Sequence, residues 1–160
     1  MTQQLLSIVA AFYNEEEAIP AFFREIEAVM RTLDLRVEYV CVNDGSSDGT
    51  LALLRGQMTK TPNIRVVNLA RNFGKEAAIS AGLAHARGSA AIVIDADLQD
   101  PPSLIPAFVA KWREGYDVVY GVRASRRADS LLKRATGRMF YALFNRLTEV
   151  QIPPGAGDFR

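Results

Sequence analysis

Short apolar runs rich in β-branched residues recur along the chain, and each has the length of a β-strand. They cover residues 5–12, 37–42, 64–69, 90–94 and 117–122. Runs of this length, bounded by polar residues, are typical of buried strands. The pattern therefore predicts five strands.

Segments with helical periodicity separate these runs. In the segment 16–33, apolar residues recur every three or four positions from Ile19 to Met30. The other segments with helical spacing are 48–58, 75–86 and 102–112. Strand and helix alternate, which predicts an α/β fold with a mostly parallel sheet and helices on both faces.

Polar residues gather after the first four runs. They occur in the sequences YNE (13–15), NDGSSD (43–48), RNFGK (71–75) and DADLQD (95–100). In a parallel sheet, loops and helix N-termini converge beyond the carboxyl ends of the strands, and ligands bind there. The loops at the opposite edge, such as 59–63 and 87–89, have ordinary turn residues. We therefore expect the functional side chains at one edge of the sheet.

Asp95, Asp97 and Gln99 follow the fourth run directly. Two carboxylates and an amide oxygen at alternate positions can direct three oxygen ligands to one point, which suits Mg²⁺ or Mn²⁺ bound together with phosphate. The alternative is a polar loop in which an aspartate caps the next helix, with Asp100 the better candidate. We favour the metal site, because crowded carboxylates repel one another unless a cation lies between them.

The residues after the first two runs suit a nucleotide. Asp44 ends the second run and could accept hydrogen bonds from a base or a sugar, or it could be a turn residue. The chain lacks both GxGxxG and GxxxxGK[ST], so a dinucleotide site and a triphosphate hydrolase are not expected. A nucleotide can instead be held through its base and ribose by an aromatic side chain and carboxylates, while a metal ion binds its diphosphate. Such a site would suit an activated donor with a diphosphate leaving group.

Composition narrows the class of protein. The 160 residues are 49% hydrophobic, which is enough for one domain with one core. There are 19 Lys and Arg against 18 Asp and Glu, so no nucleic-acid partner is expected. The single cysteine, Cys41, cannot form an internal disulfide, which favours a cytoplasmic compartment.

Six motifs in order resemble glycosyltransferase family 2. They are FYNEEE (12–17), VNDGSSDGT (42–50), LARNFGKEAA (69–78), DADLQDPP (95–102), YGVRASR (120–126) and GAGDFR (155–160). More narrowly, they resemble the dolichyl- and undecaprenyl-phosphate glycosyltransferases, which move a sugar from a nucleotide diphosphate to a polyprenyl phosphate. One departure is Ala11, where the family often has proline.

The resemblance implies a GT-A nucleotide-diphospho-sugar transferase fold and inversion at the anomeric carbon. By position, it implies that Tyr13, Glu15 and Asp44 contact the nucleoside and that Lys75 lies near it. It also implies that the metal and the diphosphate are held by Asp95 and by the two oxygen ligands that follow it.

A basic amphipathic segment follows the last predicted strand. Residues 123–147 contain seven basic residues and one acidic residue. As a helix, this segment could lie in a membrane interface or pack on the sheet with its arginines in solvent; we favour the membrane, where a lipid-linked acceptor is met. Its apolar face could also support a homo-oligomer. The resemblance implies that the acceptor phosphate is bound first by Arg123, and then by Arg126, Arg134 and Arg138.

Asp158 lies in the final motif, where the family often has an acidic residue near the reacting sugar. It could act as a base, orient sugar hydroxyls or be a turn residue. Relatives usually continue through further helices, often transmembrane ones. We therefore expect residues 1–122 to form the nucleotide-sugar core, and residues 123–160 to be an acceptor and membrane segment of the same domain, truncated at its end.

These features predict a metal-dependent hexosyltransferase at the cytoplasmic face of the inner membrane. UDP-hexose is the favoured donor and GDP-mannose the second. The alternatives are a family 2 enzyme that acts on a sugar hydroxyl in polysaccharide or glycolipid synthesis, and a truncated nucleotide-binding domain without turnover. A nicotinamide dehydrogenase shares the strand pattern but would require the missing glycine fingerprint.

Overall fold

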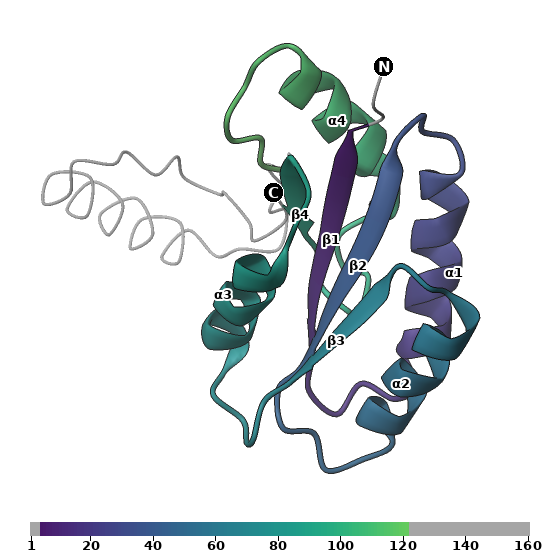
Figure 1. Ribbon diagram of the computed structural model, residues 1–160, viewed down its shortest axis with the longest axis vertical. Helices are drawn as coiled ribbons and strands as arrows, with labels where there is room; N and C mark the ends of the chain where they lie inside the picture. Colours follow the sequence, from purple (N-terminus) through teal and green to yellow (C-terminus); the bar gives the residue numbers. More distant parts are fainter. Residues whose placement is uncertain (1–3, 122–160) are drawn as a thin grey trace, which may run out of the picture. The chain divides into compact units, whose positions relative to one another are not determined.

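The computed structural model describes residues 4–121. Strands and helices alternate along this part of the chain (Figure 1). The elements are β1 (Leu5–Phe12), α1 (Ile19–Met30), β2 (Arg36–Asn43), α2 (Thr50–Lys60), β3 (Ile64–Asn68), α3 (Lys75–His85), β4 (Ala90–Val93), a 3₁₀ helix (Pro102–Leu104) and α4 (Ile105–Arg113). The strands form one parallel sheet in the order β3-β2-β1-β4.

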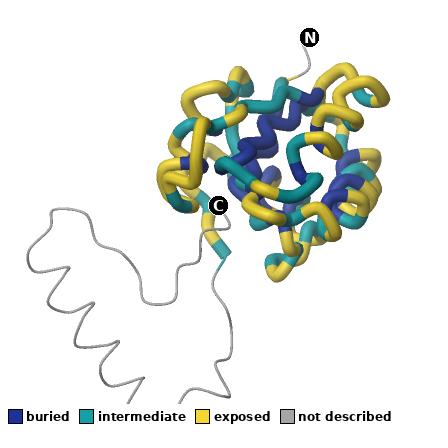
Figure 2. Tube along the Cα trace, turned by 90° about the horizontal axis from the view of Figure 1, so that it is seen from below, coloured by how far each residue is buried: buried dark blue, intermediate teal, exposed yellow. Residues whose placement is uncertain are grey.

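The sheet separates two cores of unequal size. Leu6, Ile8 and Phe12 of β1 point to the larger core, which is shared with α1, α2 and α4. Val9 points to the other face and packs in a small cluster with Ile79 of α3. Figure 2 shows the buried chain in the middle, enclosed by exposed surfaces. The predicted arrangement, a parallel sheet with helices on both faces, is confirmed.

The first four predicted strands form close to their expected bounds, but the first helix is shorter than the segment 16–33. It begins at Ile19, because the residues before it bind another loop. The backbone N–H of Glu15 donates to Thr50 Oγ1 at 2.9 Å, and that of Glu16 donates to Asp48 Oδ2 at 3.3 Å. These contacts with Asp48, in the loop after β2, and with Thr50, the first residue of α2, hold the chain in a turn up to the first helical residues.

The prediction of a fifth strand is wrong for residues 117–121, which form no strand. Val118 is 65% exposed, while Val119 packs against the larger core. Strand formation requires a neighbouring strand to share backbone hydrogen bonds, and among the described strands β4 pairs with β1 alone. An apolar run by itself does not reveal whether such a neighbour is present.

Candidate functional site

A pocket of about 320 Å³ opens at the carboxyl ends of β1, β2 and β4, beside the start of α3. It brings together residues from four separate parts of the sequence. Six residues that the sequence singles out line it, namely Tyr13, Glu15, Asp44, Lys75, Asp95 and Asp97. The predicted convergence of polar residues at this edge of the sheet is therefore confirmed.

The loops after β1 and β2 are joined by hydrogen bonds between motif residues. Asn14 has a φ of 54°, and its Oδ1 accepts a hydrogen bond from Ser47 N at 2.9 Å. Its own N–H donates to Ser46 Oγ at 3.0 Å, and Gly49 N donates to Glu16 Oε2 at 2.6 Å. These contacts tie the loop that carries Tyr13 and Glu15 of the pocket to the loop after β2.

Asp44 is 2% exposed and holds the loop after β3. Its Oδ1 accepts a hydrogen bond from Phe73 N at 2.8 Å, and its Oδ2 accepts one from Gly74 N at 3.0 Å. The next residue, Gly45, has a φ of 66°, and a Cβ there would overlap the backbone of Arg71. Asp44 thus positions one wall of the pocket. Its contact with a nucleoside stays a prediction.

Lys75 and Asp95 form an ion pair inside the pocket. Lys75 Nζ lies 2.8 Å from Asp95 Oδ1 and 3.0 Å from Oδ2. The sequence predicts that each residue lies near the nucleotide, but it does not predict this contact. Both oxygens of the first aspartate in the predicted metal motif therefore face an ammonium group of the protein itself.

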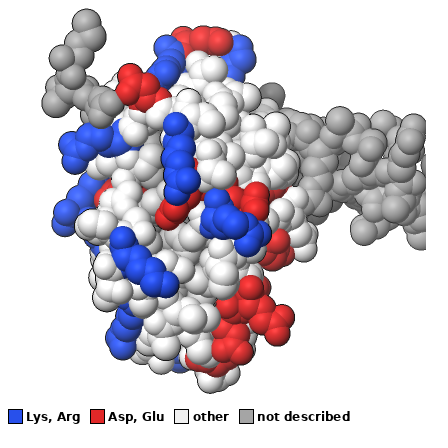
Figure 3. All heavy atoms as spheres, turned by 90° about the vertical axis from the view of Figure 1, so that its right-hand side faces the viewer, with Lys and Arg blue, Asp and Glu red and all other residues white. Residues whose placement is uncertain are grey.

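Negative charge is crowded on the other side of the pocket. Burial raises the pKa of Glu15, and the nearby carboxylates of Asp97 and Asp48 raise it further. Asp97 is exposed, and its Oδ1 accepts a hydrogen bond from Gln99 N at 3.1 Å. The predicted metal ligand Gln99 does not line the pocket. Figure 3, which looks onto the side carrying α1 and α2, shows acidic side chains gathered toward its lower edge.

These donors fit a divalent cation that is shared with a diphosphate. Among residues 4–121, no three or more His, Cys, Asp or Glu side chains are grouped so that they could hold a metal ion by themselves. Mg²⁺ is commonly bound by one or two carboxylates together with substrate phosphates. The Asp97 carboxylate, beside Glu15, matches that pattern better than it matches an all-protein cage.

Asn72, whose role the sequence does not indicate, also lines the pocket. Its Oδ1 accepts a hydrogen bond from Gly74 N at 2.9 Å, so it shares that N–H with Asp44. Beside it, the Arg71 guanidinium lies 4.2 Å from the centre of the Phe73 ring, which is half exposed. The polar-aromatic-glycine order of RNFG after a strand is the signal that could have indicated this turn.

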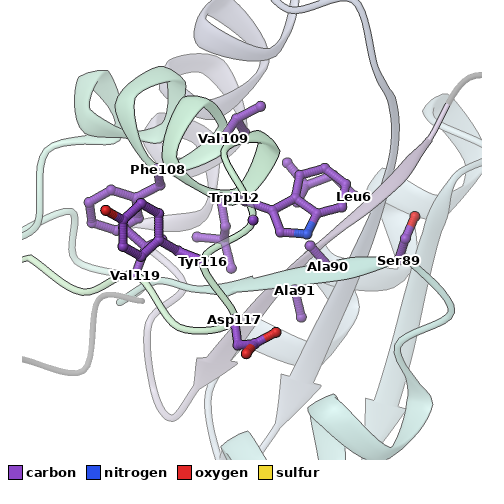
Figure 4. A pocket seen from close by; sticks show the side chains of 12 residues that line it. Leu6, Ser89, Ala90, Ala91, Phe108, Val109, Trp112, Tyr116, Asp117 and Val119 are labelled. Atoms are coloured by element: carbon purple, nitrogen blue, oxygen red, sulfur yellow. The ribbon is translucent and has the colours of Figure 1, made fainter.

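A second hollow, of about 280 Å³, lies between β4 and α4. Figure 4 shows the rings of Phe108 and Tyr116 close together on one side of the hollow, and the Trp112 ring near Leu6 and Ala90 on the other. None of the residues that the sequence singles out for chemistry lines it. Its polar side chains are Ser89, Tyr116 and Asp117, so a single carboxylate faces this hollow, against the several that line the first pocket.

The opposite edge of the sheet holds a buried carboxylate, Glu38, which is 8% exposed. Its Oε1 accepts hydrogen bonds from Ser7 Oγ and Arg87 N, both at 2.6 Å, and its Oε2 lies 3.6 Å from Arg65. Burial alone would raise the pKa of Glu38, but the hydrogen bonds and Arg65 lower it overall. The loop 87–89 takes part in this cluster, because Gly88 N also donates to Ser7 Oγ at 2.9 Å.

The residues predicted for the acceptor side lie outside the described part of the chain. They are Arg123, Arg126, Arg134, Arg138 and Asp158. Within residues 4–121, every helix is too short or too polar to be a membrane span.

Comparison with known sequences identifies close relatives. An uncharacterized glycosyltransferase of Synechocystis sp. is 51% identical over 155 residues, which is 97% of this chain and 49% of that protein. The bactoprenol glucosyl transferase of Shigella phage SfV is 42% identical over 155 residues, 97% of this chain and 50% of that protein. The chain spans about half the length of these curated relatives.

Comparison with solved structures supports the fold. The mannosyltransferase PcManGT from Pyrobaculum calidifontis, solved with GDP-Man and Mn²⁺, matches with a TM-score of 0.60 and 24% identity, over 79% of this chain and 37% of that one. The predicted α/β GT-A fold is confirmed. The model of the family "Glycosyl transferase family 2" matches residues 7–160. The chain therefore belongs to glycosyl transferase family 2.

Proposed function

We propose that this protein transfers a hexose from a nucleotide-diphosphate sugar to a polyprenyl phosphate. The observation that carries the proposal is the pocket at the carboxyl ends of the strands, where Tyr13, three carboxylates and Lys75 converge with the buried Asp44. The relative named bactoprenol glucosyl transferase supports a polyprenyl acceptor. UDP-hexose is the favoured donor, and GDP-mannose is the second.

On the donor side, the exposed ring of Tyr13 offers a surface on which a base can stack. Glu15 and Asp44 offer acceptors for base and ribose hydroxyl groups, and Lys75 offers positive charge to the diphosphate. Asp97, with Asp95, would hold Mg²⁺ or Mn²⁺, and a role for Gln99, which does not line the pocket, stays a prediction. Such an ion supplies positive charge that offsets the charge developing on the departing diphosphate.

On the acceptor side, an anionic phosphate oxygen forms the new bond to the anomeric carbon. The bond from that carbon to the donor diphosphate breaks on the opposite face, and its electron pair leaves with the nucleoside diphosphate, so the configuration inverts. A phosphate oxygen needs no general base near pH 7, but it does need its charge compensated. Arg123, then Arg126, Arg134 and Arg138, are proposed for this, because an arginine fork matches phosphate geometry.

Asp158 is proposed to orient the sugar or to act as a base, and the acceptor separates these roles. With a phosphate acceptor, Asp158→Asn should retain much of the turnover. With a sugar hydroxyl as acceptor, which requires proton removal, the same substitution should abolish it. The reaction is proposed to occur at the cytoplasmic face of the inner membrane, with the basic segment 123–147 at the lipid surface.

The test uses radiolabelled UDP-glucose, UDP-GlcNAc and GDP-mannose, incubated with the protein, short polyprenyl phosphates and Mn²⁺. The proposal predicts that label from one donor moves into the organic phase, and that omitting the polyprenyl phosphate or adding EDTA prevents this. Transfer to a soluble sugar acceptor, with none to the lipid, would support the alternative in which a hydroxyl is glycosylated. Nucleotide binding without transfer to either acceptor would support a domain without turnover.

A further inference from the structure

The ion pair between Lys75 and Asp95 lies where the donor diphosphate is proposed to bind. The ammonium nitrogen lies within 3.0 Å of both carboxylate oxygens. The Lys75 side chain is 43% exposed and that of Asp95 is 28% exposed, so solvent and small ions reach the pair. The contact is therefore accessible, and its partners can exchange.

The backbone on both sides of this ion pair is fixed. Lys75 is the first residue of α3, and the preceding Gly74 donates its N–H to the buried Asp44. Asp95 directly follows Ile94, which is 1% exposed and whose N–H donates to Val9 O in β1 at 3.0 Å. The fold thus places the lysine and the aspartate opposite one another before any ligand binds.

The charges around the pocket are unevenly compensated. Among the described residues that line it, Lys75 is the only one with a positive charge, and it contacts Asp95. Asp44 receives two backbone N–H groups instead. The carboxylates of Glu15 and Asp97 lie close enough for Asp97 to raise the pKa of Glu15. The carboxylates of Glu15 and Asp97 attract a divalent cation, but the ammonium group of Lys75 in the same pocket repels it.

We infer that Lys75 is a built-in counter-ion of Asp95, which weakens divalent-cation binding until a nucleotide diphosphate arrives. This inference rests on the proposed function of the pocket. A diphosphate gives the ammonium group a second anionic partner, so that the lysine can share or release Asp95. Cation and nucleotide then bind cooperatively, because each lowers the electrostatic cost of binding the other.

The test compares Mn²⁺ binding to the wild-type chain and to Lys75→Met, with electron paramagnetic resonance reporting free Mn²⁺. Without nucleotide, Lys75→Met should bind Mn²⁺ about tenfold more tightly, since the Asp95 carboxylate is no longer neutralised by the ammonium group and can attract the ion. Saturating UDP or GDP should tighten Mn²⁺ binding less in the variant than in the wild type, by about the same factor. Lys75→Gln, which keeps a polar side chain, should show the same tighter Mn²⁺ binding and the same smaller effect of nucleotide.

Two control variants connect the effect to the ion pair. Lys75→Arg keeps the positive charge, so its Mn²⁺ affinity without nucleotide should stay close to that of the wild type. In an Asp95→Asn background, the carboxylate is absent, and Lys75→Met should change Mn²⁺ affinity much less than it does in the wild type. A double-mutant cycle of the wild type, Lys75→Met, Asp95→Asn and the variant with both substitutions therefore isolates the contribution of the pair.

Unchanged or weaker Mn²⁺ binding by both Lys75→Met and Lys75→Gln would overturn the inference, as would unreduced coupling with nucleotide. A different result would contradict the proposed function of the pocket. If the wild type binds neither nucleotide, with or without Mn²⁺, the pocket is not a donor site. The nucleotide-free comparison still decides whether Lys75 opposes the cation.

Discussion

Two glutamates at opposite ends of the same parallel sheet have pKa values that are shifted in opposite directions. Glu38 lies at the amino ends of the strands, where hydrogen bonds from Ser7 and Arg87, with Arg65 nearby, outweigh its burial and lower its pKa. Glu15 lies at the carboxyl ends, where burial and then Asp97 and Asp48 raise its pKa. One end of the sheet stabilises its carboxylate, and the other crowds its carboxylates together.

The difference separates a structural cluster from a functional site. At Glu38, the partners belong to the protein, and the group is 8% exposed, so no outside ligand is needed. At Glu15, the neighbouring carboxylates increase the demand for positive charge and the pocket is open to solvent. A site that is incomplete electrostatically is a better candidate for ligand binding than one already satisfied.

The largest expected effect is on the structural cluster. Glu38→Ala should lower the free energy of unfolding by about 3 kcal/mol, because Ser7, Arg87 and Arg65 lose a buried partner. Denaturant unfolding measures this. Glu38→Gln keeps an acceptor oxygen and should cost less. Nucleotide affinity of the folded variants should stay within about twofold of the wild type, and a selective loss of affinity without loss of stability would contradict the separation.

Asp97→Asn should have the next largest effect, which is a loss of nucleotide binding. Mn²⁺-dependent nucleotide affinity should fall about 100-fold, or about 2.7 kcal/mol, because the proposed cation loses an anionic ligand. Stability should not fall, since repulsion with Glu15 is reduced. Titration calorimetry with UDP and GDP, in Mn²⁺ or EDTA, measures the nucleotide affinity, and denaturant unfolding measures the stability. Asp100→Asn, in the same loop but outside the pocket lining, is the matched control, and equal losses in the two variants would refute the assignment.

The pH dependence of stability should distinguish the two ends. Because the pKa of Glu38 is lowered, its contribution is fully present above its usual value near 4.5 and is lost as the pH falls through the lowered value. Glu38→Gln should therefore be less stable than the wild type at neutral pH and approach it in acid. Unfolding midpoints measured from pH 3 to pH 7 check this. Parallel curves at all pH values would contradict it.

Glu15→Gln should have the smallest effect, with the opposite sign. Its raised pKa means that the ionised form destabilises the folded protein above that pKa. The variant should gain less than about 0.5 kcal/mol at pH 7, since solvent screens an incompletely buried site, and the gain should vanish in acid. Thermal unfolding at the two pH values measures it, and a clear loss of stability at pH 7 would count against repulsion at this site.

Much of the fold could be predicted from the sequence because the strands are short, apolar and buried. The run 5–12 became β1 with the same bounds. The run 117–121 has a similar composition but no paired neighbour, and pairing is a property of tertiary structure. The start of α1 was also missed, because its position depends on contacts of Glu15 with Thr50 and of Glu16 with Asp48, each more than thirty residues away in the sequence.

The positions of the site residues could be predicted because parallel topology brings strand ends together. The partner of each side chain could not. Asp95 faces Lys75, and Asp44 faces backbone N–H groups; both contacts depend on the exact course of the loop after β3. The Glu38 cluster was missed, although a glutamate inside an apolar strand indicates a buried partner.

The central claim is that the pocket at the carboxyl ends of the strands binds a nucleotide together with a divalent cation. The most direct measurement is a crystal structure of the protein with UDP and Mn²⁺, with data collected for the anomalous signal of manganese. The account predicts a manganese peak beside Asp97 and the pyrophosphate between it and Lys75. A nucleotide in the hollow between β4 and α4, or a manganese peak away from Asp97, would contradict it.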